Sequence, residues 1–162
     1  MQKRDHKNTH SVDSRKILLG VIGERIVACI LRKQGMTVEE SLNVFDMEKD
    51  MLVNDNRVEV KTQVPIMIED SFGVTMSQKN KIMNSHRVYF VSVPPQRNQD
   101  PLAGSIFEMN PGDPQLKAHK WRTHNGREML CFPRRQPAMK LIHQITDEVI
   151  LQQLKDLTTT YM

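Results

Sequence analysis

Two carboxylates and an amine lie close together along the chain, a combination that suits metal-assisted chemistry on phosphate. They belong to Asp50, Glu59 and Lys61. Carboxylates at close range repel each other, and a divalent cation between them relieves the repulsion. Mg²⁺ prefers carboxylate oxygens and keeps water molecules, one of which can become a nucleophile. We therefore expect a Mg²⁺ site, in which Mn²⁺ would substitute, with Asp50, Glu59 and the backbone carbonyl of Val60 as ligands. Lys61 would stabilise charge that develops on a phosphate, or orient the attacking water.

A β-hairpin is the element that would bring these groups together. Asp and Asn tolerate positive φ, so Asp55-Asn56 is the predicted two-residue turn between strands near 50–53 and 57–63. This register pairs Val53 with Val58, Leu52 with Glu59, and Asp50 with Lys61. Because side chains alternate along a strand, one face would carry Asp50, Leu52, Glu59, Lys61 and Gln63, and the other Met51, Val53, Val58 and Val60. The alternative is an exposed amphipathic hairpin whose charges only decorate the surface.

Glu24, on a predicted N-terminal helix, is a third candidate ligand. It projects from the apolar face of that helix, where a lone carboxylate is expensive to bury. Gly20 and Gly23 each cost about 1 kcal/mol in a helix interior. Two glycines beside Glu24 suggest that the helix backbone approaches the sheet and the metal site closely. The alternative is a boundary glutamate that reaches solvent.

Positive charge gathers in the last third of the chain. The formal net charge is +4 and the pI is near 9.2. The charged residues of 39–50 are five acids and one lysine, whereas those of 117–140 are seven lysines or arginines and one glutamate. An acidic pocket near a cationic surface suits a polyanion that is held by lysine and arginine. The candidate nucleic-acid contacts in the basic stretch are Lys120, Arg122, Arg127, Arg134 and Arg135. A solvated basic face is the alternative, and Trp121 could either stack on bases or belong to a core.

The elements needed to position these residues form a mixed α/β domain. Residues 1–12 are expected as a flexible arm, followed by a single domain at 13–162 with a core at about 14–93 and a C-terminal elaboration at about 105–157. Helices are predicted from Asp13 or Ser14 to Gln34, from a Ser77 cap to about Asn84, and from Thr146 or Asp147 to about Leu157. Strands are predicted near 37–42, 88–93 and 106–109, together with an appended hairpin at 119–123 and 129–132 that turns at Asn125-Gly126.

Composition narrows the class of protein. A chain of 162 residues fits one domain with its own core. Its longest apolar runs are too short to cross a bilayer and its first residues do not resemble a signal peptide, so we expect a cytoplasmic protein, or one of the host cytoplasm if viral. Cys29 and Cys131 are expected to be buried free thiols, and no histidine spacing indicates zinc.

Together these residues resemble the PD-(D/E)xK nuclease superfamily, which includes Holliday junction resolvases and many restriction endonucleases. The resemblance covers about 18–93: a Gly-Glu helix, Asp50, the Glu59-Val60-Lys61 motif, Gln63, a second helix and a core strand. It implies a restriction-endonuclease-like mixed sheet flanked by helices. It also implies that Asp50 and Glu59 bind the metal, that Glu24 completes the site, that Lys61 is catalytic, and that Gln63 positions site groups or water.

The second helix also resembles that superfamily, whereas the residues around Asp50 depart from its motif. Gln78 and Lys81, with Lys79, lie where members often contact phosphate. Lys49 stands where the motif has proline, and Asp46 is a competing carboxylate.

The function expected from this resemblance is Mg²⁺-dependent endonucleolytic hydrolysis of DNA. A single compact domain without a separate specificity module favours selectivity for structures, such as junctions, over selectivity for sequence. Enzymes that cut both strands pair two subunits, so a homodimer is expected by analogy. The alternatives are an RNA endonuclease on the same fold and a nucleic-acid-binding module that no longer cuts.

Overall fold

A computed structural model of the chain describes residues 2–40 and 51–159, with side chains from Ser14 onward within these ranges. The elements in chain order are α1 (Gln2–Lys33), β1 (Val38–Glu39), β2 (Met51–Val53), β3 (Asn56–Gln63), β4 (Ser71–Thr75), the 3₁₀ helix η1 (Met76–Gln78), α2 (Lys79–Met83), β5 (Arg87–Ser92), β6 (Ser105–Met109), β7 (His119–Arg122), β8 (Glu128–Pro133), β9 (Met139–Gln144) and α3 (Glu148–Leu157). The protein is an α/β protein, as predicted.

Two sheets organise the chain. The larger sheet has the order β1-β2-β3-β5-β6-β9, and the smaller has the order β4-β8-β7. Strands β3 and β5 run parallel, whereas the other neighbours in the larger sheet are antiparallel. A parallel pair needs a crossover connection, and here β4, η1 and α2 lie between β3 and β5 in the chain. The larger sheet is therefore mixed.

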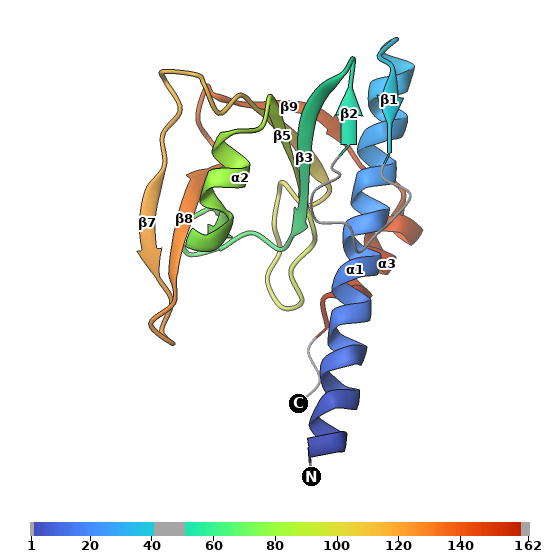
Figure 1. The fold of residues 1–162 in the computed structure, drawn as a ribbon, viewed down its shortest axis with the longest axis vertical. Helices are drawn as coiled ribbons and strands as arrows, with labels where there is room; N and C mark the ends of the chain where they lie inside the picture. Colours follow the sequence, from blue (N-terminus) through green and yellow to red (C-terminus); the bar gives the residue numbers. More distant parts are fainter. Residues whose placement is uncertain (1, 41–50, 160–162) are drawn as a thin grey trace.

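The larger sheet is covered on both faces (Figure 1). Helices α1 and α3 lie side by side on one face, while α2 and the smaller sheet lie on the other. Each interface has its own apolar core. The core on the α1 side contains Val27, Leu31, Val58, Val91 and Leu154, among others. The core on the α2 side contains Phe72, Ile82, Phe90, Met109 and Phe132, among others.

Helix α1 ends where the sequence predicts but begins earlier. Gly35 has a φ of +89° and follows the last turn, as expected of a glycine that ends a helix. The predicted cap at Asp13 or Ser14 is wrong, because α1 begins at Gln2 and residues 2–12 are helical. Each residue added to an existing helix gains a hydrogen bond, and Lys, Arg and Gln are good helix formers. In the described ranges, no helix combines the length and apolar character needed to cross a bilayer.

The predicted β2–β3 hairpin exists, but its turn lies one residue earlier than expected. Asn54 and Asp55 adopt φ values of 48° and 67°, so Met51 pairs with Val58 and Leu52 with Arg57. The predicted pairs Val53–Val58 and Leu52–Glu59 are therefore wrong. Asn54 fixes this turn because its Oδ1 accepts a hydrogen bond from the Thr37 amide at 2.9 Å. The observed register differs from the predicted one by two residues. Because side chains alternate with a period of two, every described side chain keeps its predicted face.

Most later elements match the predictions, with three differences. Strands β5 and β6, the β7–β8 hairpin and α3 with its Asp147 cap are confirmed. The predicted Ser77 cap is wrong, because Ser77 lies inside η1 and α2 begins at Lys79. Strands β4 and β9 were not predicted. Because β8 pairs with β4, the hairpin is part of a second sheet that packs on the core and is not a separate appendage.

Candidate active site

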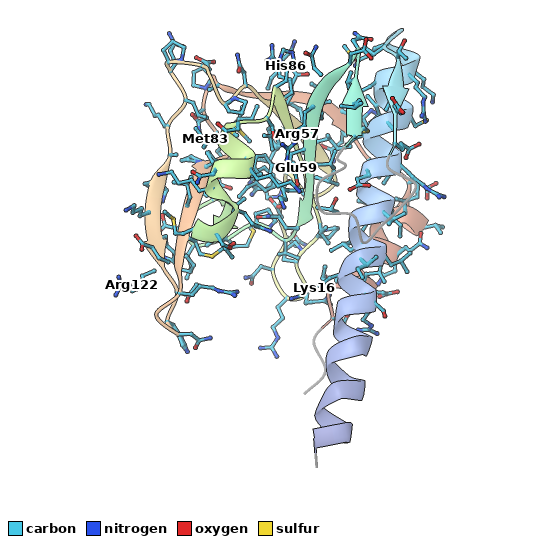
Figure 2. All side chains as sticks on the ribbon, in the orientation of Figure 1. Lys16, Arg57, Glu59, Met83, His86 and Arg122 are labelled. Carbon is cyan, nitrogen blue, oxygen red and sulfur yellow. The ribbon has the colours of Figure 1, made fainter. Side chains whose placement is uncertain are left out.

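Glu59 is a buried carboxylate held between two lysines. Its side chain is 8% exposed, and its Oε1 lies 3.3 Å from Lys61 Nζ. Its Oε2 lies 3.6 Å from Lys81 Nζ. Figure 2 shows Glu59 in the middle of the molecule, between β3 and α2. Each carboxylate oxygen therefore lies within ion-pair distance of an ammonium group.

The position of this group follows from the alternation along β3. Glu59, Lys61 and Gln63 point to the α2 side of the sheet, and Val58, Val60 and Thr62 point to the α1 side. The parallel neighbours of Glu59 and Lys61 on β5 are Val88 and Phe90, both in the core on the α2 side. An ionised carboxylate beside such a core is stable only when it is paired. The lysines supply that pairing.

Lys81 reaches Glu59 because α2 is anchored over the sheet. The next residue, Ile82, is fully buried in the core on the α2 side. The Ser85 hydroxyl also donates a hydrogen bond to the Lys81 carbonyl at 2.8 Å. Lys81 was predicted from its place on the second helix to contact phosphate. Its ion pair with Glu59 could not be predicted, because it depends on how the crossover returns to the sheet.

Gln63 links the two sheets. Its side-chain amide donates to the Gly73 carbonyl at 2.9 Å, and its side-chain carbonyl accepts from the Gly73 amide at 2.8 Å. The side chain thus pairs with β4 as a neighbouring strand would. Gln63 lies on the same strand face as Glu59 and Lys61, and its amide atoms hold β4 in place.

Glu24 lies on the helix that covers the other face of the sheet. It is half-buried and follows Gly23, where an added Cβ would overlap the Thr62 hydroxyl. The predicted close approach of the helix backbone to the sheet is thus confirmed at Gly23. It is wrong at Gly20, where a Cβ would meet nothing within 4 Å. Val60 packs its side chain against the α1-side core, so its contribution to a site near Glu59 would come from its backbone.

Asp50 lies outside the described residues, as does its predicted pairing with Lys61. Among the side chains that the structure places, no group of three or more His, Cys, Asp or Glu residues gathers at one point. The role of Asp50 as a metal ligand beside Glu59 therefore stays a prediction.

The cations predicted to bind nucleic acid lie in different surroundings. Lys120 and Arg122 are exposed on β7, Arg127 is exposed in the following turn, and Gln78 is half-buried at the end of η1. Lys120 Nζ lies 3.5 Å from Glu128 Oε1. Arg135 is 63% exposed and pairs with Asp70 at 2.7 Å. Trp121 is half-buried on β7 opposite Met129.

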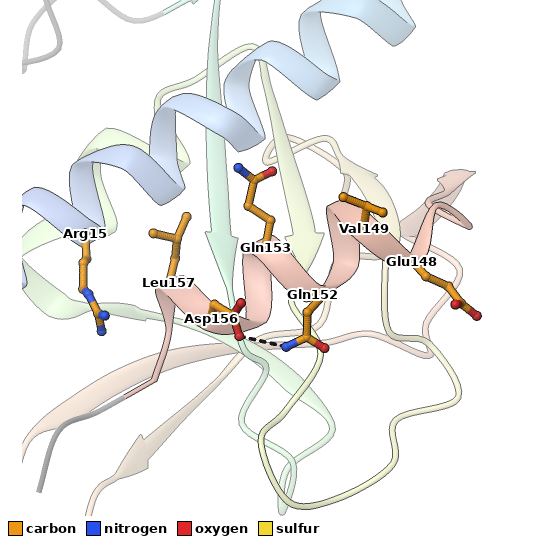
Figure 3. Close-up of a pocket in the computed structure, with 7 residues that line it drawn as sticks. All are labelled: Arg15, Glu148, Val149, Gln152, Gln153, Asp156 and Leu157. Carbon is orange, nitrogen blue, oxygen red and sulfur yellow. Dashed lines mark hydrogen bonds between the residues drawn. The ribbon is translucent and has the colours of Figure 1, made fainter.

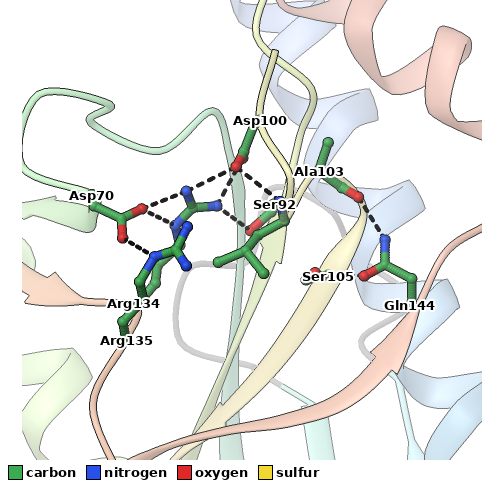
Figure 4. Close-up of polar contacts among 9 residues, drawn as sticks. Asp70, Ser92, Asp100, Ala103, Ser105, Arg134, Arg135 and Gln144 are labelled. Atoms are coloured by element: carbon green, nitrogen blue, oxygen red, sulfur yellow. Dashed lines mark hydrogen bonds and ion pairs between the residues drawn. The ribbon is translucent and has the colours of Figure 1, made fainter.

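Arg134 is a correction to the predicted interface, because its side chain is only 1% exposed. Figure 4 shows its guanidinium between two aspartates. Its Nη1 lies 2.8 Å from Asp100 Oδ2, and its Nη2 lies 2.6 Å from Asp70 Oδ1. Nη1 also donates to the Ser92 hydroxyl at 3.5 Å. These contacts join the residue after β8 to the residue before β4, the end of β5 and the loop before β6, so Arg134 is structural.

The same contacts shift the proton affinities of the network. Burial alone would lower the pKa of the Arg134 guanidinium, but hydrogen bonds to Asp100 and Asp70 outweigh it and raise the pKa. Burial alone would raise the pKa of the Asp70 carboxyl, but hydrogen bonds from Arg134 and Arg135 outweigh it and lower the pKa. Both groups are therefore held in their charged forms.

Two open grooves lie on the α1–α3 side, away from Glu59. One, of about 770 Å³, is lined by Arg15 and six residues of α3, including Glu148 and Asp156 (Figure 3). The other, of about 510 Å³, lies between α1, α3 and β9 and includes Cys29 in its lining. Cys29 is exposed, contrary to prediction, whereas Cys131 is buried as predicted.

Comparison with known proteins identifies no relative: no protein family, no curated protein and no solved structure matches the chain.

Proposed function

We propose that the chain is a Mg²⁺-dependent endonuclease of the PD-(D/E)xK type that hydrolyses phosphodiester bonds in DNA. One observation carries this proposal. Glu59 and Lys61 extend from the same face of β3 with 3.3 Å between carboxylate and ammonium, and the Glu59 side chain is 8% exposed. A buried acid beside an amine is typical of a functional site, although ion pairs that serve only structure also occur.

The order of the elements also supports the proposal. A helix that carries a Gly-Glu pair is followed by the β2–β3 hairpin, with Glu59 and Lys61 on β3. After β4 and η1, which the resemblance does not include, come the second helix and then a core strand parallel to β3. Apart from β4 and η1, this is the order that the resemblance to PD-(D/E)xK nucleases implies.

The donor chemistry of the site fits a hard divalent cation. The Glu59 carboxylate is buried and already draws positive charge to both oxygens, and oxygen ligands of this kind suit Mg²⁺ or Mn²⁺. Glu59, the Val60 carbonyl and Asp50 would hold the ion, without Glu24, because α1 covers the opposite face of the sheet. Asp50 belongs to the proposal only, because it lies outside the described residues. The chemistry that a bound ion supplies is polarisation of the phosphate and activation of a water.

Lys61 and Gln63, on the same strand face as Glu59, would stabilise the phosphate charge and the site itself. Lys61 is 20% exposed, so its ammonium has access to a phosphate beside Glu59. In that position it would stabilise the charge that develops on the equatorial oxygens. Gln63 would keep β4 against the end of β3 through its bonds to Gly73. Its contribution would be to hold the site rigid.

The nucleic acid would lie across α2 and β7. Lys120 is opposite Leu130 in the β7–β8 pairing, and opposite residues of an antiparallel pair share a face. Leu130 is in the core on the α2 side, so Lys120 and Arg122 project on the side of the small sheet that α2 covers. Together with Gln78 and Lys81 they would form one cationic path to Glu59, with Arg127 and Arg135 nearer its ends. A homodimer that cuts both strands belongs to the same proposal.

Substitution of the two central groups tests the proposal. Glu59→Gln and Lys61→Met should each lower Mg²⁺-dependent cleavage of labelled duplex DNA or four-way junctions by at least about a hundredfold. The control is Glu39→Gln, which removes an exposed carboxylate on β1 and should leave the rate unchanged. Circular dichroism would verify that each variant is folded.

The substrate panel separates the remaining possibilities. Cleavage of RNA but not DNA would replace the proposal with an RNA endonuclease. Binding of nucleic acid without Mg²⁺-dependent cleavage would indicate a module that no longer cuts. Full cleavage by Glu59→Gln would remove Glu59 from the active site.

A further inference from the structure

The second lysine of the site, Lys81, has a role that the sequence did not indicate. Its Nζ lies 3.6 Å from Glu59 Oε2, while Lys61 Nζ lies 3.3 Å from Oε1. One carboxylate thus lies beside two ammonium groups from two different elements. Any further cation that binds Glu59 must enter a place where positive charge already compensates the acid.

We infer that Lys81 is a positioning residue that holds the Glu59 carboxylate and competes with a divalent ion for it. The inference rests on the proposed function, since it concerns the metal of that site. A cation within about 4–6 Å of a bound ion disfavours its binding by the same electrostatics that shift a pKa by 1–3 units. Removal of the Lys81 charge should therefore strengthen divalent-ion binding at Glu59.

We expect Lys81, rather than Lys61, to move away from Glu59 when a divalent ion binds. Its distance of 3.6 Å to Glu59 is the longer of the two, and its side chain is 25% exposed against 20% for Lys61. The α2 backbone is fixed by buried Ile82 and by the hydrogen bond from Ser85. A rotation of the flexible lysine side chain would thus carry the ammonium towards solvent, or towards a phosphate, without moving the helix.

Titration with Mn²⁺ tests this role without reference to catalysis. The loss of the free Mn²⁺ signal in electron paramagnetic resonance would be followed for the wild-type chain and for Lys81→Met, Lys81→Gln and Lys81→Arg. The two neutral variants should bind Mn²⁺ about tenfold more tightly than the wild type. Lys81→Arg keeps the charge and should remain close to wild type. The matched control is Lys79→Met, which removes an exposed charge from the same helix and should change affinity less than about twofold.

Thermal melting adds a readout of the holding role. In EDTA both neutral variants should melt below the wild type, because Glu59 has lost the ammonium group beside its Oε2. Saturating Mn²⁺ should narrow that difference.

The outcomes separate this inference from the proposed function. If the wild type binds Mn²⁺ and cuts nucleic acid but the neutral Lys81 variants bind Mn²⁺ no more tightly, the inference is wrong and the nuclease proposal stands. If no variant binds Mn²⁺, both are wrong. Weaker Mn²⁺ binding by both neutral variants would instead identify Lys81 as a group that supports the metal site.

Discussion

At the scale of single residues, Arg134 shows how a surface-type residue becomes part of a core. Its guanidinium is 1% exposed, and the carboxylate of its partner Asp100 is fully buried. Two charges in such a place are tolerated only as a pair, because removal of one leaves the other without compensation. The network therefore predicts an asymmetry between Arg134 and its exposed neighbour Arg135.

Arg134→Met should lower the free energy of unfolding by about 3–5 kcal/mol, since Asp100 would stay buried without its cation. Arg135→Met should lower it by less than about 1 kcal/mol, because the pair it makes with Asp70 is exposed. Urea unfolding followed by circular dichroism would measure both values. Similar losses for the two variants would show that the buried pair does not stabilise the fold.

The choice between these two arginines could not be made from the sequence. Arg134 and Arg135 are adjacent in a basic stretch and have the same chemistry. Only the position of Asp100, 34 residues earlier in the chain, decides which of them is buried. No local pattern marks that aspartate, because it lies in a loop rich in proline and polar residues. The residue types thus predicted where positive charge lies in the sequence, while tertiary contacts determined which arginine is structural and which is exposed.

At the scale of elements, the packing of α1 on β3 depends on one glycine. A Cβ at Gly23 would overlap the Thr62 hydroxyl and come within 2.9 Å of the Thr62 Cβ, whereas a Cβ at Gly20 would meet nothing within 4 Å. Both glycines lie inside the same helix, where glycine is unfavourable.

The two glycines should therefore respond oppositely to alanine. Gly20→Ala should stabilise the protein by about 0.5–1 kcal/mol through helix propensity alone. Gly23→Ala should destabilise it by about 1–3 kcal/mol, because α1 must move away from the sheet. Chemical denaturation of the pair would measure both changes. Stabilisation by Gly23→Ala would contradict the close contact between helix and sheet.

Periodicity predicted elements well where one face of a strand is apolar. Alternation along β3 placed Glu59 and Lys61 on one face and Val58 and Val60 on the other, and the structure agrees. The turn was misplaced because Asn54, Asp55 and Asn56 all tolerate positive φ. A hydrogen bond from Thr37, far away in the chain, selects Asn54.

The two missed strands lack such a pattern. β4 has Gly73 at its centre, and glycine normally weakens a strand. Here the side-chain amide of Gln63 makes two hydrogen bonds to the backbone of Gly73. These bonds stabilise the strand at the position that glycine weakens. β9 has an exposed apolar residue, Leu141, which is 52% exposed, so its alternation is broken. These strands depend on partners that a local reading cannot identify.

At the scale of the whole molecule, the basic residues are divided between layers. Lys120 and Arg122 project on the side of the small sheet that α2 covers. Arg25 is exposed on α1, on the far face of the larger sheet. The net charge of +4 does not distinguish these surfaces, but the fold does.

This division gives a prediction about salt. Each phosphate contact adds about 0.9 to the magnitude of the slope of log binding constant against log salt concentration on duplex DNA. Arg122→Ala should therefore weaken DNA binding in EDTA and reduce that slope by about one, while Arg25→Ala should change neither by much. Fluorescence anisotropy between about 50 and 200 mM salt would measure both variants. If Arg25→Ala reduced the slope and Arg122→Ala did not, the nucleic-acid-binding surface would lie on the α1–α3 layer. Because the larger sheet then separates DNA from Glu59, that result would also count against Glu59 as the catalytic centre.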